Sequence, residues 1–301
     1  MEETEFIWMD GTQVPWKDAK IHVITHTLHY GGGVFEGIRC YETDKGPAVF
    51  RLKDHVDRLF YSAKAFEMKF PYSKEQFTEA IKETIKVNKL KAGYIRPLII
   101  FGYGKMGVNP VGCPVNCSIA VWPWGKYLSA DAVKVKIPKI IRIHPGTTDP
   151  NAKICGNYAN SILASLEINK GGYDEALLLD YKGIISEGPG ENVFCAKDGK
   201  IYTPKLGTIL PGITRKSIIQ LAKDEGYEVI EKDITADEIK NATEVWFTGT
   251  AAEVTAIGSV DDQKIGNGEP GPITTKLKDI FMDIVKGKNE KYKSWLTYVN
   301  E

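Results

Sequence analysis

The sequence contains no long apolar run and no excess of charge of either sign. No segment approaches the roughly twenty consecutive apolar residues that span a bilayer, so a membrane-spanning helix is not expected. The 39 lysines and arginines balance the 39 aspartates and glutamates, and no basic block stands out. Neither nucleic acid nor an anionic membrane is therefore an expected partner, and we expect small-molecule ligands.

Cysteine is scarce, with five residues scattered along the chain. An odd, dispersed set in a chain of this length does not predict disulfides. Cys113 and Cys117 form one C-x-x-x-C pair, and His26 and His29 form one H-x-x-H pair, but neither has the spacing of a structural zinc site. We therefore predict no metal, and we interpret Cys155 as a packing residue.

The 301 residues, 43% of them apolar, predict a globular protein of two domains. Strand patterning is lost after Trp124 and returns near residue 133. We accordingly predict a smaller first domain over residues 1–125, a linker over 126–132 and a larger second domain over 133–301. The acidic start lacks the charged-then-apolar order of a signal peptide, so the expected location is cytoplasmic.

Local patterns predict a mixture of strands and helices. Asp10-Gly11 predicts a tight hairpin, and two further hairpins are predicted near residues 44–46 and 198–199. Residues 21–42 are typical of a strand, a glycine break at Gly31 to Gly33, and a second strand. Periodic apolar residues, and a capping box at Ser73 and Gln76, predict helices over residues 51–68, 73–90, 158–169 and 271–285, with another after Gly212.

A G-x-G-x-x-G motif lies at Gly102, Gly104 and Gly107, directly after an apolar run. A dinucleotide site would need a helix to begin at the third glycine. The following residues VNPVGCPVN contain two prolines and a glycine, which exclude that helix. This context argues against a nicotinamide-dependent oxidoreductase.

The most informative stretch runs from Lys153 to Phe194. It opens with K-I-C-G-N-Y and closes with S-E-G-P-G-E-N-V-F, which sets two carboxylates, Glu187 and Glu191, in a polar loop between apolar runs. A lysine among small and apolar neighbours can be partly desolvated, which makes its amine a usable nucleophile. Each piece alone is also compatible with a solvated lysine and an ordinary turn.

Together these motifs resemble the signature of the fold type IV pyridoxal-phosphate enzymes, and most closely the branched-chain amino-acid aminotransferases. The resemblance is extended by H-Y-G-G-G-V-F-E-G-I-R, Y-I-R-P, G-M-G-V-N-P and L-P-G-I-T-R, and it runs from about Tyr30 to Pro272. It implies an α+β fold of two domains, like that of D-amino-acid aminotransferase, with the active site at the domain interface.

The resemblance also implies a set of cofactor residues for pyridoxal 5'-phosphate. By this match Lys153 is catalytic and forms the Schiff base, Glu187 pairs with the pyridine nitrogen, and Tyr158 lies near the phenolic oxygen. The phosphate would be held by Arg58, whose planar guanidinium suits it better than a lysine would. The remaining implied cofactor contacts come from Leu210, Ile213, Thr214 and Thr250, and a helix that starts at Ile213 would offer free amides to an anion.

The implied substrate residues come from both domains. They are expected to contact the substrate side chain or its carboxylates, and they are Tyr30, Phe35, Gly37, Tyr94, Arg96, Met106, Val108, Trp124, Tyr127, Thr250 and Ala251. The implied substrates are L-leucine, isoleucine or valine and 2-oxoglutarate, which react in turn by ping-pong kinetics. The family precedent further implies a homodimer as the minimal unit.

Three alternatives remain at this point. A D-amino-acid aminotransferase or an aminodeoxychorismate-lyase-like enzyme would share Lys153, Glu187 and Arg58. A non-catalytic pyridoxal-phosphate binding protein would keep the lysine without turning over amino acids. The nicotinamide enzyme would bind no pyridoxal phosphate. The loop motifs favour the branched-chain group.

Overall fold

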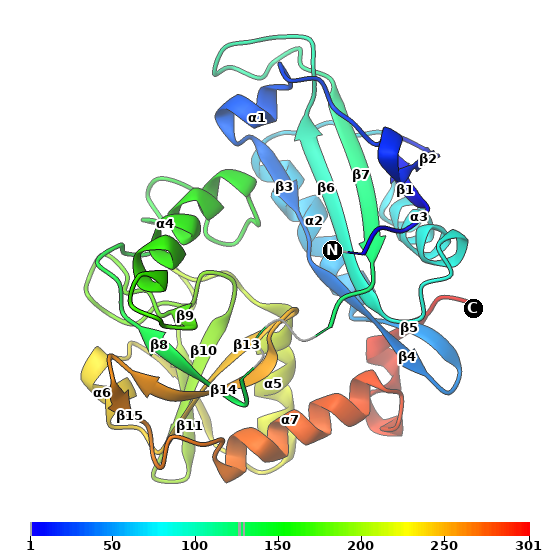
Figure 1. The fold of residues 1–301 in the computed structure, drawn as a ribbon. Coiled ribbons are helices and arrows are strands. Elements are labelled where there is room, and N and C mark those ends of the chain that lie inside the picture. Colours follow the sequence, from blue (N-terminus) through cyan, green and yellow to red (C-terminus); the bar gives the residue numbers. More distant parts are fainter. Residues whose placement is uncertain (1, 126–127, 129) are drawn as a thin grey trace. The chain divides into compact units, whose positions relative to one another are not determined.

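The computed structural model describes residues 2–125, 128 and 130–301, and the chain divides into two compact units. The first unit comprises Met1–Gly125, Ala152–Gly156 and Asp283–Glu301, and the second comprises Lys126–Asn151 and Asn157–Met282. Each unit contains its own sheet, so the α+β class is confirmed (Figure 1). Within the described ranges, no helix combines the length and apolar character that crossing a bilayer requires.

The first unit is built on one sheet with the strand order β16-β5-β4-β6-β7-β1-β2, and β3 also pairs with β6. The strands in this unit are antiparallel to their neighbours. Their bounds are β1 Phe6–Met9, β2 Thr12–Pro15, β3 Gly33–Phe35, β4 Ile38–Thr43, β5 Gly46–Phe50, β6 Gly93–Phe101, β7 Val115–Trp122 and β16 Leu296–Tyr298.

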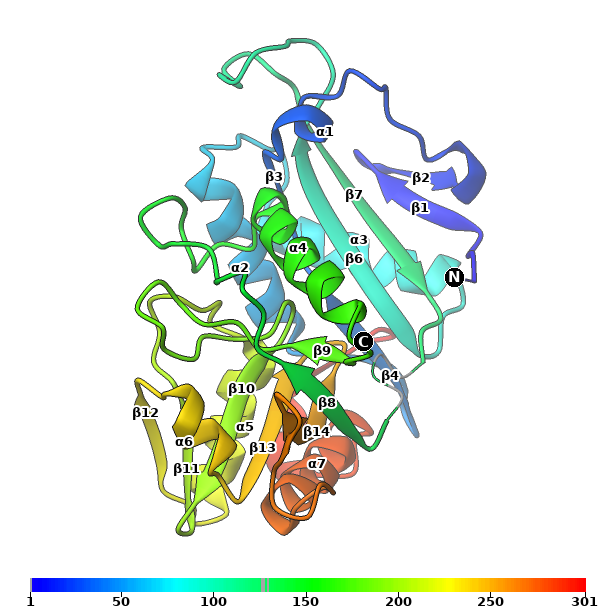
Figure 2. The same cartoon turned by 60° about the vertical axis from the view of Figure 1, so that its left-hand side comes forward.

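Two helices, α2 (Leu52–Ala65) and α3 (Lys74–Val87), cover one face of this sheet, as both cartoon views show (Figures 1 and 2). They bury Leu59 and Phe77, which are fully shielded from solvent, against strands β6 and β7. A short helix, α1 (His26–Tyr30), precedes β3 and ends at Gly31, whose left-handed backbone stops it. The hydrophobic core of this unit holds α2 and β3 in place, and both elements carry candidate site residues.

The second unit contains a sheet with the strand order β12-β11-β10-β13-β14-β8-β9. A further strand, β15, pairs with β14. Its strands are β8 Ala132–Lys136, β9 Glu175–Ala176, β10 Asn192–Lys197, β11 Lys200–Pro204, β12 Val229–Lys232, β13 Glu244–Gly249, β14 Glu253–Val260 and β15 Gln263–Lys264. The helices that begin in this unit are α4 Tyr158–Asn169, α5 Ile213–Asp224, α6 Ala236–Lys240 and α7 Pro272–Val285.

Most of the predicted elements are confirmed. The Asp10-Gly11 hairpin joins β1 to β2, the Ser73 and Gln76 capping box begins α3, and α4 has the predicted bounds. The prediction of two strands over residues 21–42 is wrong at residues 26–30, which form α1. Behind Gly107 no helix begins, so the structure agrees with the rejection of a dinucleotide motif.

One short segment belongs to a different unit from its neighbours in the sequence. Ala152–Gly156 lies with the first unit, although its flanks lie with the second. The reason is local pairing: Ile154 forms a β-bridge with Val34, and the Gly156 amide donates to the Gly31 carbonyl at 3.1 Å. Lys153 is therefore positioned by the first unit. The predicted domain bounds stay a prediction.

Candidate active site

The backbone of Lys153 is held from two sides within the first unit. Its amide N–H donates to the Ser62 hydroxyl at 2.9 Å, and its carbonyl accepts the Phe35 N–H at 3.1 Å. Ser62 lies on α2 and Phe35 ends β3, so a helix and a strand fix the two peptide units on either side of the Lys153 Cα. The Lys153 side chain then starts from a rigid base.

The side chain of Lys153 lies beside an aromatic ring that also carries an arginine. The Lys153 Nζ is 4.9 Å from the centroid of the Phe35 ring, and the Arg96 Cζ is also 4.9 Å from it. Arg96 is 5.3 Å from the Tyr94 ring as well, and its Nη2 donates to the Tyr94 hydroxyl at 3.4 Å. An amine, a guanidinium and apolar ring surface are thus gathered in one place.

A buried carboxylate, Glu36, directly follows Phe35 in the sequence. Glu36 is fully shielded from solvent and accepts Arg58 Nε at 2.6 Å and Arg58 Nη2 at 2.9 Å. Its Oε2 also lies 2.7 Å from His55 Nδ1. Burial alone would raise the pKa of Glu36, but Arg58 and His55 hold that pKa far below its usual range. The pKa of His55 is lowered by its burial, against the attraction of Glu36.

The sequence motif assigns Arg58 to the cofactor phosphate. Its side chain is 11% exposed, and two of its guanidinium nitrogens are engaged by Glu36. This bidentate pair fixes the plane of the guanidinium. The phosphate role of Arg58 stays a prediction, and nothing along the sequence indicates that Glu36 is its anchor.

Gly37 is required by the position of Tyr94. A Cβ atom at residue 37 would collide with the Tyr94 hydroxyl, so only glycine allows β4 to approach this ring. Tyr94 packs at 4.4 Å from Trp124 and at 5.3 Å from Trp122, measured between ring centroids. The structure therefore brings Phe35, Gly37, Tyr94, Arg96 and Trp124 into one cluster near Lys153, and we call it the Phe35 cluster.

Three other predicted substrate residues lie on α1 and on the loop between β6 and β7 of the same unit. Tyr30 on α1 accepts the Gly107 amide on its hydroxyl at 3.3 Å, and the two neighbours of that glycine are Met106 and Val108. His26 Nε2 lies 2.9 Å from the Gly107 carbonyl, so α1 holds the loop after β6 (Figure 1). All three predicted residues are exposed. They form a group of their own, separate from the Phe35 cluster in the contacts described.

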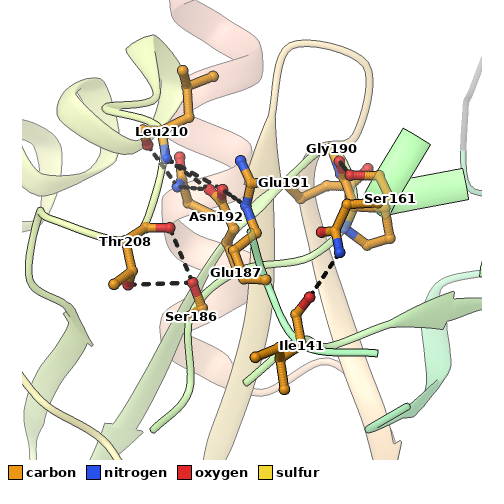
Figure 3. A network of polar contacts seen from close by, with 12 residues as sticks. Ile141, Ser161, Ser186, Glu187, Gly190, Glu191, Asn192, Thr208 and Leu210 are labelled. Carbon is orange, nitrogen blue, oxygen red and sulfur yellow. Dashed lines mark hydrogen bonds and ion pairs between the residues drawn. The ribbon is translucent and has the colours of Figure 1, made fainter. Parts of the chain in front are cut away.

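In the second unit, Glu187 is the centre of a dense set of donors (Figure 3). It is 4% exposed and accepts Asn192 Nδ2 at 3.0 Å and the Leu210 amide at 3.1 and 3.2 Å. The buried Arg142 donates through Nε to Glu187 Oε1 at 2.7 Å. All of these neighbours donate, which suits a carboxylate that only accepts. Leu210, predicted as a cofactor contact, thus turns its amide to Glu187.

The predicted anion site, which stays a prediction, lies at the start of α5. Its N-cap Gly212 supplies no side-chain hydrogen bond, so the first-turn amides of Ile213 and Thr214 are not capped by a side chain. A Cβ at Gly212 would collide with Asn192 Oδ1, which explains the glycine here. Both predicted residues are buried.

The remaining candidates lie at element ends. Thr250 and Ala251 form the turn between β13 and β14, and Tyr158 begins α4. Ser161, one turn along α4, donates to the Pro189 carbonyl at 3.0 Å, which ties the helix to the Glu187 loop (Figure 3). Tyr127 lies outside the described residues. In the described part of the chain, no group of three or more histidine, cysteine, aspartate or glutamate side chains is arranged to hold a metal ion.

The sequence was compared with protein families and with known proteins. Residues 33–260 match the family model described as amino-transferase class IV. The chain is 48% identical to a branched-chain-amino-acid aminotransferase of Pseudomonas aeruginosa, over 97% of each chain. It is 44% identical to the protein of that name in Escherichia coli, over 100% of this chain and 99% of the relative.

Among solved structures, the chain resembles the T.th. branched-chain amino acid aminotransferase complexed with N-(5'-phosphopyridoxyl)-L-glutamate. The TM-score is 0.97 and the identity 45%, with all of both chains covered. The same protein with pyridoxamine 5'-phosphate matches with a TM-score of 0.97 at 44% identity, again over the whole of both chains. These similarities cover the whole chain and not only the motifs that carry the family resemblance.

Proposed function

Because the chain belongs to the class IV aminotransferases, and among them to the branched-chain-amino-acid aminotransferases, we propose that it transfers the amino group between L-leucine, isoleucine or valine and 2-oxoglutarate. The observation that carries this proposal is the Phe35 ring, which lies 4.9 Å from the Lys153 amine and 4.9 Å from the Arg96 guanidinium. Apolar surface and a cation beside one nucleophilic amine suit both substrate types.

The residues present fit pyridoxal 5'-phosphate. Glu187 is a buried carboxylate that accepts hydrogen bonds from Arg142, Asn192 and the Leu210 amide, and a carboxylate is the partner that a protonated pyridine nitrogen requires. Arg142 Nη1, beside it, is buried without a hydrogen-bond partner, so the polar surroundings of Glu187 are not completed by the described residues alone. When bound, the cofactor supplies a ring that withdraws electrons from the substrate Cα.

We assign the cofactor contacts residue by residue. Lys153 would bind pyridoxal 5'-phosphate covalently through Nζ, and Glu187 would pair with its ring nitrogen. Tyr158 lies at the phenolic oxygen. The phosphate is bound by Arg58, by Thr250 and by the amides of Ile213 and Thr214, and Leu210 is a further cofactor contact. The support is the fixed guanidinium of Arg58 and the α5 amides that no side chain caps.

Lys153 also performs the proton transfer. Its amine removes the Cα proton of the amino acid and returns a proton later in the transfer, so it acts as general base and then as general acid. Because Ser62 and Phe35 hold the Lys153 backbone, the position of the side chain is restricted during both proton transfers. Lys153 is therefore the one side chain to which we assign the bond-making chemistry.

Substrate recognition is assigned to the Phe35 cluster and the loops. Arg96 and Tyr30 meet the distal carboxylate of glutamate or 2-oxoglutarate, because a guanidinium binds carboxylates well. The amides of Thr250 and Ala251 receive the α-carboxylate. Apolar side chains are accommodated by Phe35, Met106, Val108 and Trp124, with Gly37 and Tyr94 completing the pocket. Tyr127 is assigned to the substrate by the sequence match alone.

We further propose a homodimer as the minimal unit and a cytoplasmic location. Helix α4 exposes three apolar side chains, Ile162, Leu163 and Leu166, each more than half exposed. Apolar groups gathered on one helix are better shielded by a second subunit than left in water. Sedimentation of the purified protein checks this assignment, and charged substitutions on α4 should shift it toward the monomer.

The proposed function is tested by absorbance spectra of the purified protein, first with L-leucine and then with 2-oxoglutarate. We expect a visible band that leucine removes and 2-oxoglutarate restores, and no such band in Lys153→Ala. No band with added pyridoxal phosphate would overturn the assignment. A band that responds only to a D-amino acid would indicate the D-amino-acid aminotransferase instead, and a band that responds to no amino acid would indicate a binding protein.

A further inference from the structure

Ser62 connects the nucleophilic lysine to the helix that carries Arg58. The Ser62 side chain is fully buried on α2, one helical turn after Arg58. Its hydroxyl donates to the Arg58 carbonyl at 2.8 Å and accepts the Lys153 amide at 2.9 Å. A hydroxyl has one hydrogen to donate, so the bond to Arg58 fixes the rotor and leaves its lone pairs for the amide of Lys153.

The other contacts of the lysine segment come from the backbone. The Phe35 amide donates to the Lys153 carbonyl, and Ile154 bridges Val34 on the same strand. These bonds tie the segment to β3 with any side chain at position 62. The Ser62 bond is the attachment of the Lys153 amide to α2, and a side-chain substitution can remove it without altering the β3 bonds.

Helix stability does not explain this serine. A serine that bonds the carbonyl four residues back slightly destabilises a helix. Thr84 on α3 makes the same backward bond, to Ala80 at 2.7 Å, and accepts Gln13 Nε2 at 3.2 Å. It is equally buried but lies in a part of the first unit that holds none of the candidate site residues. Thr84 is therefore a matched example of this arrangement without the lysine.

We infer that Ser62 is a positioning residue that sets the backbone from which the Lys153 side chain reaches its reaction partner. This inference rests on the proposed role of Lys153. The lysine side chain is long and has several rotatable bonds, so a shift of its Cα is carried to the amine. Displacements near 1 Å can reduce a rate by about a hundredfold, which makes a fixed starting point valuable.

The test compares Ser62→Ala in the wild-type chain and in Lys153→Ala. Affinity for pyridoxal phosphate is measured by equilibrium dialysis, since the second background binds without the covalent bond. We expect Ser62→Ala to weaken binding about tenfold when Lys153 is present, because without the bond to α2 the backbone of Lys153 shifts and displaces its amine. In Lys153→Ala the same substitution should change the affinity less than about twofold, since no amine remains to be aimed.

Thr84→Val is the matched control, because it removes a buried hydroxyl of the same geometry. It should leave both affinities unchanged, and thermal melts of the apoproteins report the stability lost by each variant. If Ser62→Ala does not fold, Ser62→Cys replaces it, since the thiol keeps most of the volume and is a weak acceptor. The same pair of backgrounds is then compared.

Two results would overturn the inference. An equal loss of affinity in both backgrounds would mean that the substitution moves α2 and Arg58 rather than the lysine. No loss in either background would mean that β3 alone sets the lysine. A wild-type protein that shows no visible band with pyridoxal phosphate would instead overturn the proposed function, and this result is obtained before any variant is made.

Discussion

The hydroxyl of Tyr94 occupies the space into which a side chain at Gly37 would project. Gly37 has no left-handed backbone that would itself demand glycine, so the requirement is one of space alone. The Tyr94 hydroxyl accepts Arg96 Nη2 at 3.4 Å, and the ring packs against Trp124. The shape of the Phe35 cluster thus depends on a missing Cβ atom.

Gly37→Ala should therefore displace Tyr94 and reduce kcat/KM for L-leucine by about tenfold, a loss in the range that misplaced contact groups produce. The double variant Gly37→Ala with Tyr94→Phe should recover part of this activity, because it removes the Tyr94 hydroxyl, which is the nearest of the Tyr94 atoms that the new Cβ would meet. Gly125→Ala is the control, since a Cβ there meets no atom within 4 Å. A double variant less active than the single one would show that the clash is not the cause.

Arg142 and Glu187 form a pair in which both side chains are less than 10% exposed. Arg142→Met should lower the free energy of unfolding of the apoprotein by about 3 kcal/mol, because it leaves a buried carboxylate without its cation. Adding Glu187→Gln should restore much of that stability, since an amide needs no counter-ion. Urea unfolding measures both. Losses that simply add in the double variant would contradict the coupling.

The fold could be predicted where local patterns carry the information. Helix α4 has the predicted bounds, and the capping box at Ser73 places α3 correctly. Helix α1 was missed because five residues are too short to show a helical period.

The site was predictable only in part, for a related reason. Lys153 and Glu187 lie in compact motifs that can be recognised along the sequence. The residues that hold Lys153 and Glu187 do not lie in these motifs, because Arg142 is 45 residues from Glu187 and Ser62 is 91 residues from Lys153. Glu36 is 22 residues from Arg58 and looks like an ordinary loop carboxylate until the fold buries it. Long-range pairs of this kind require the tertiary structure.

The buried pair of Glu36 and His55 predicts acid sensitivity in two steps. The pKa of His55 is lowered in the folded protein by burial, with Arg58 and Lys153 adding to the effect and Glu36 opposing it. The unfolded chain therefore binds the proton first, so this stabilisation is full above about pH 6.5 and is lost as the pH falls. The pKa of Glu36 is also lowered, mainly by Arg58 and His55 against its burial, so its contribution is lost only below about pH 4.5.

We expect the free energy of unfolding of the apoprotein to fall between pH 6.5 and 5 with a slope of up to about 1.4 kcal/mol per pH unit from His55. His55→Gln should reduce that slope while leaving the steeper loss at lower pH. His144→Gln, which changes an exposed histidine, should leave the slope as it is. Chemical unfolding at a series of pH values measures it, and an unchanged slope in His55→Gln would contradict the assignment.

Arg96 should separate the two substrate types. Arg96→Met removes the guanidinium above Phe35 and keeps a long apolar side chain, so L-glutamate should lose about 10- to 100-fold in kcat/KM, the range for a lost charged hydrogen bond. L-Leucine should change less than about threefold, because it offers no distal carboxylate. Arg51→Met is the matched control, since its Cζ lies 4.5 Å from the Trp295 ring outside the Phe35 cluster. Half-reactions with each amino acid, followed by absorbance, give both values. An equal loss for the two substrates would mean that Arg96 shapes the Phe35 and Tyr94 rings rather than reading the carboxylate.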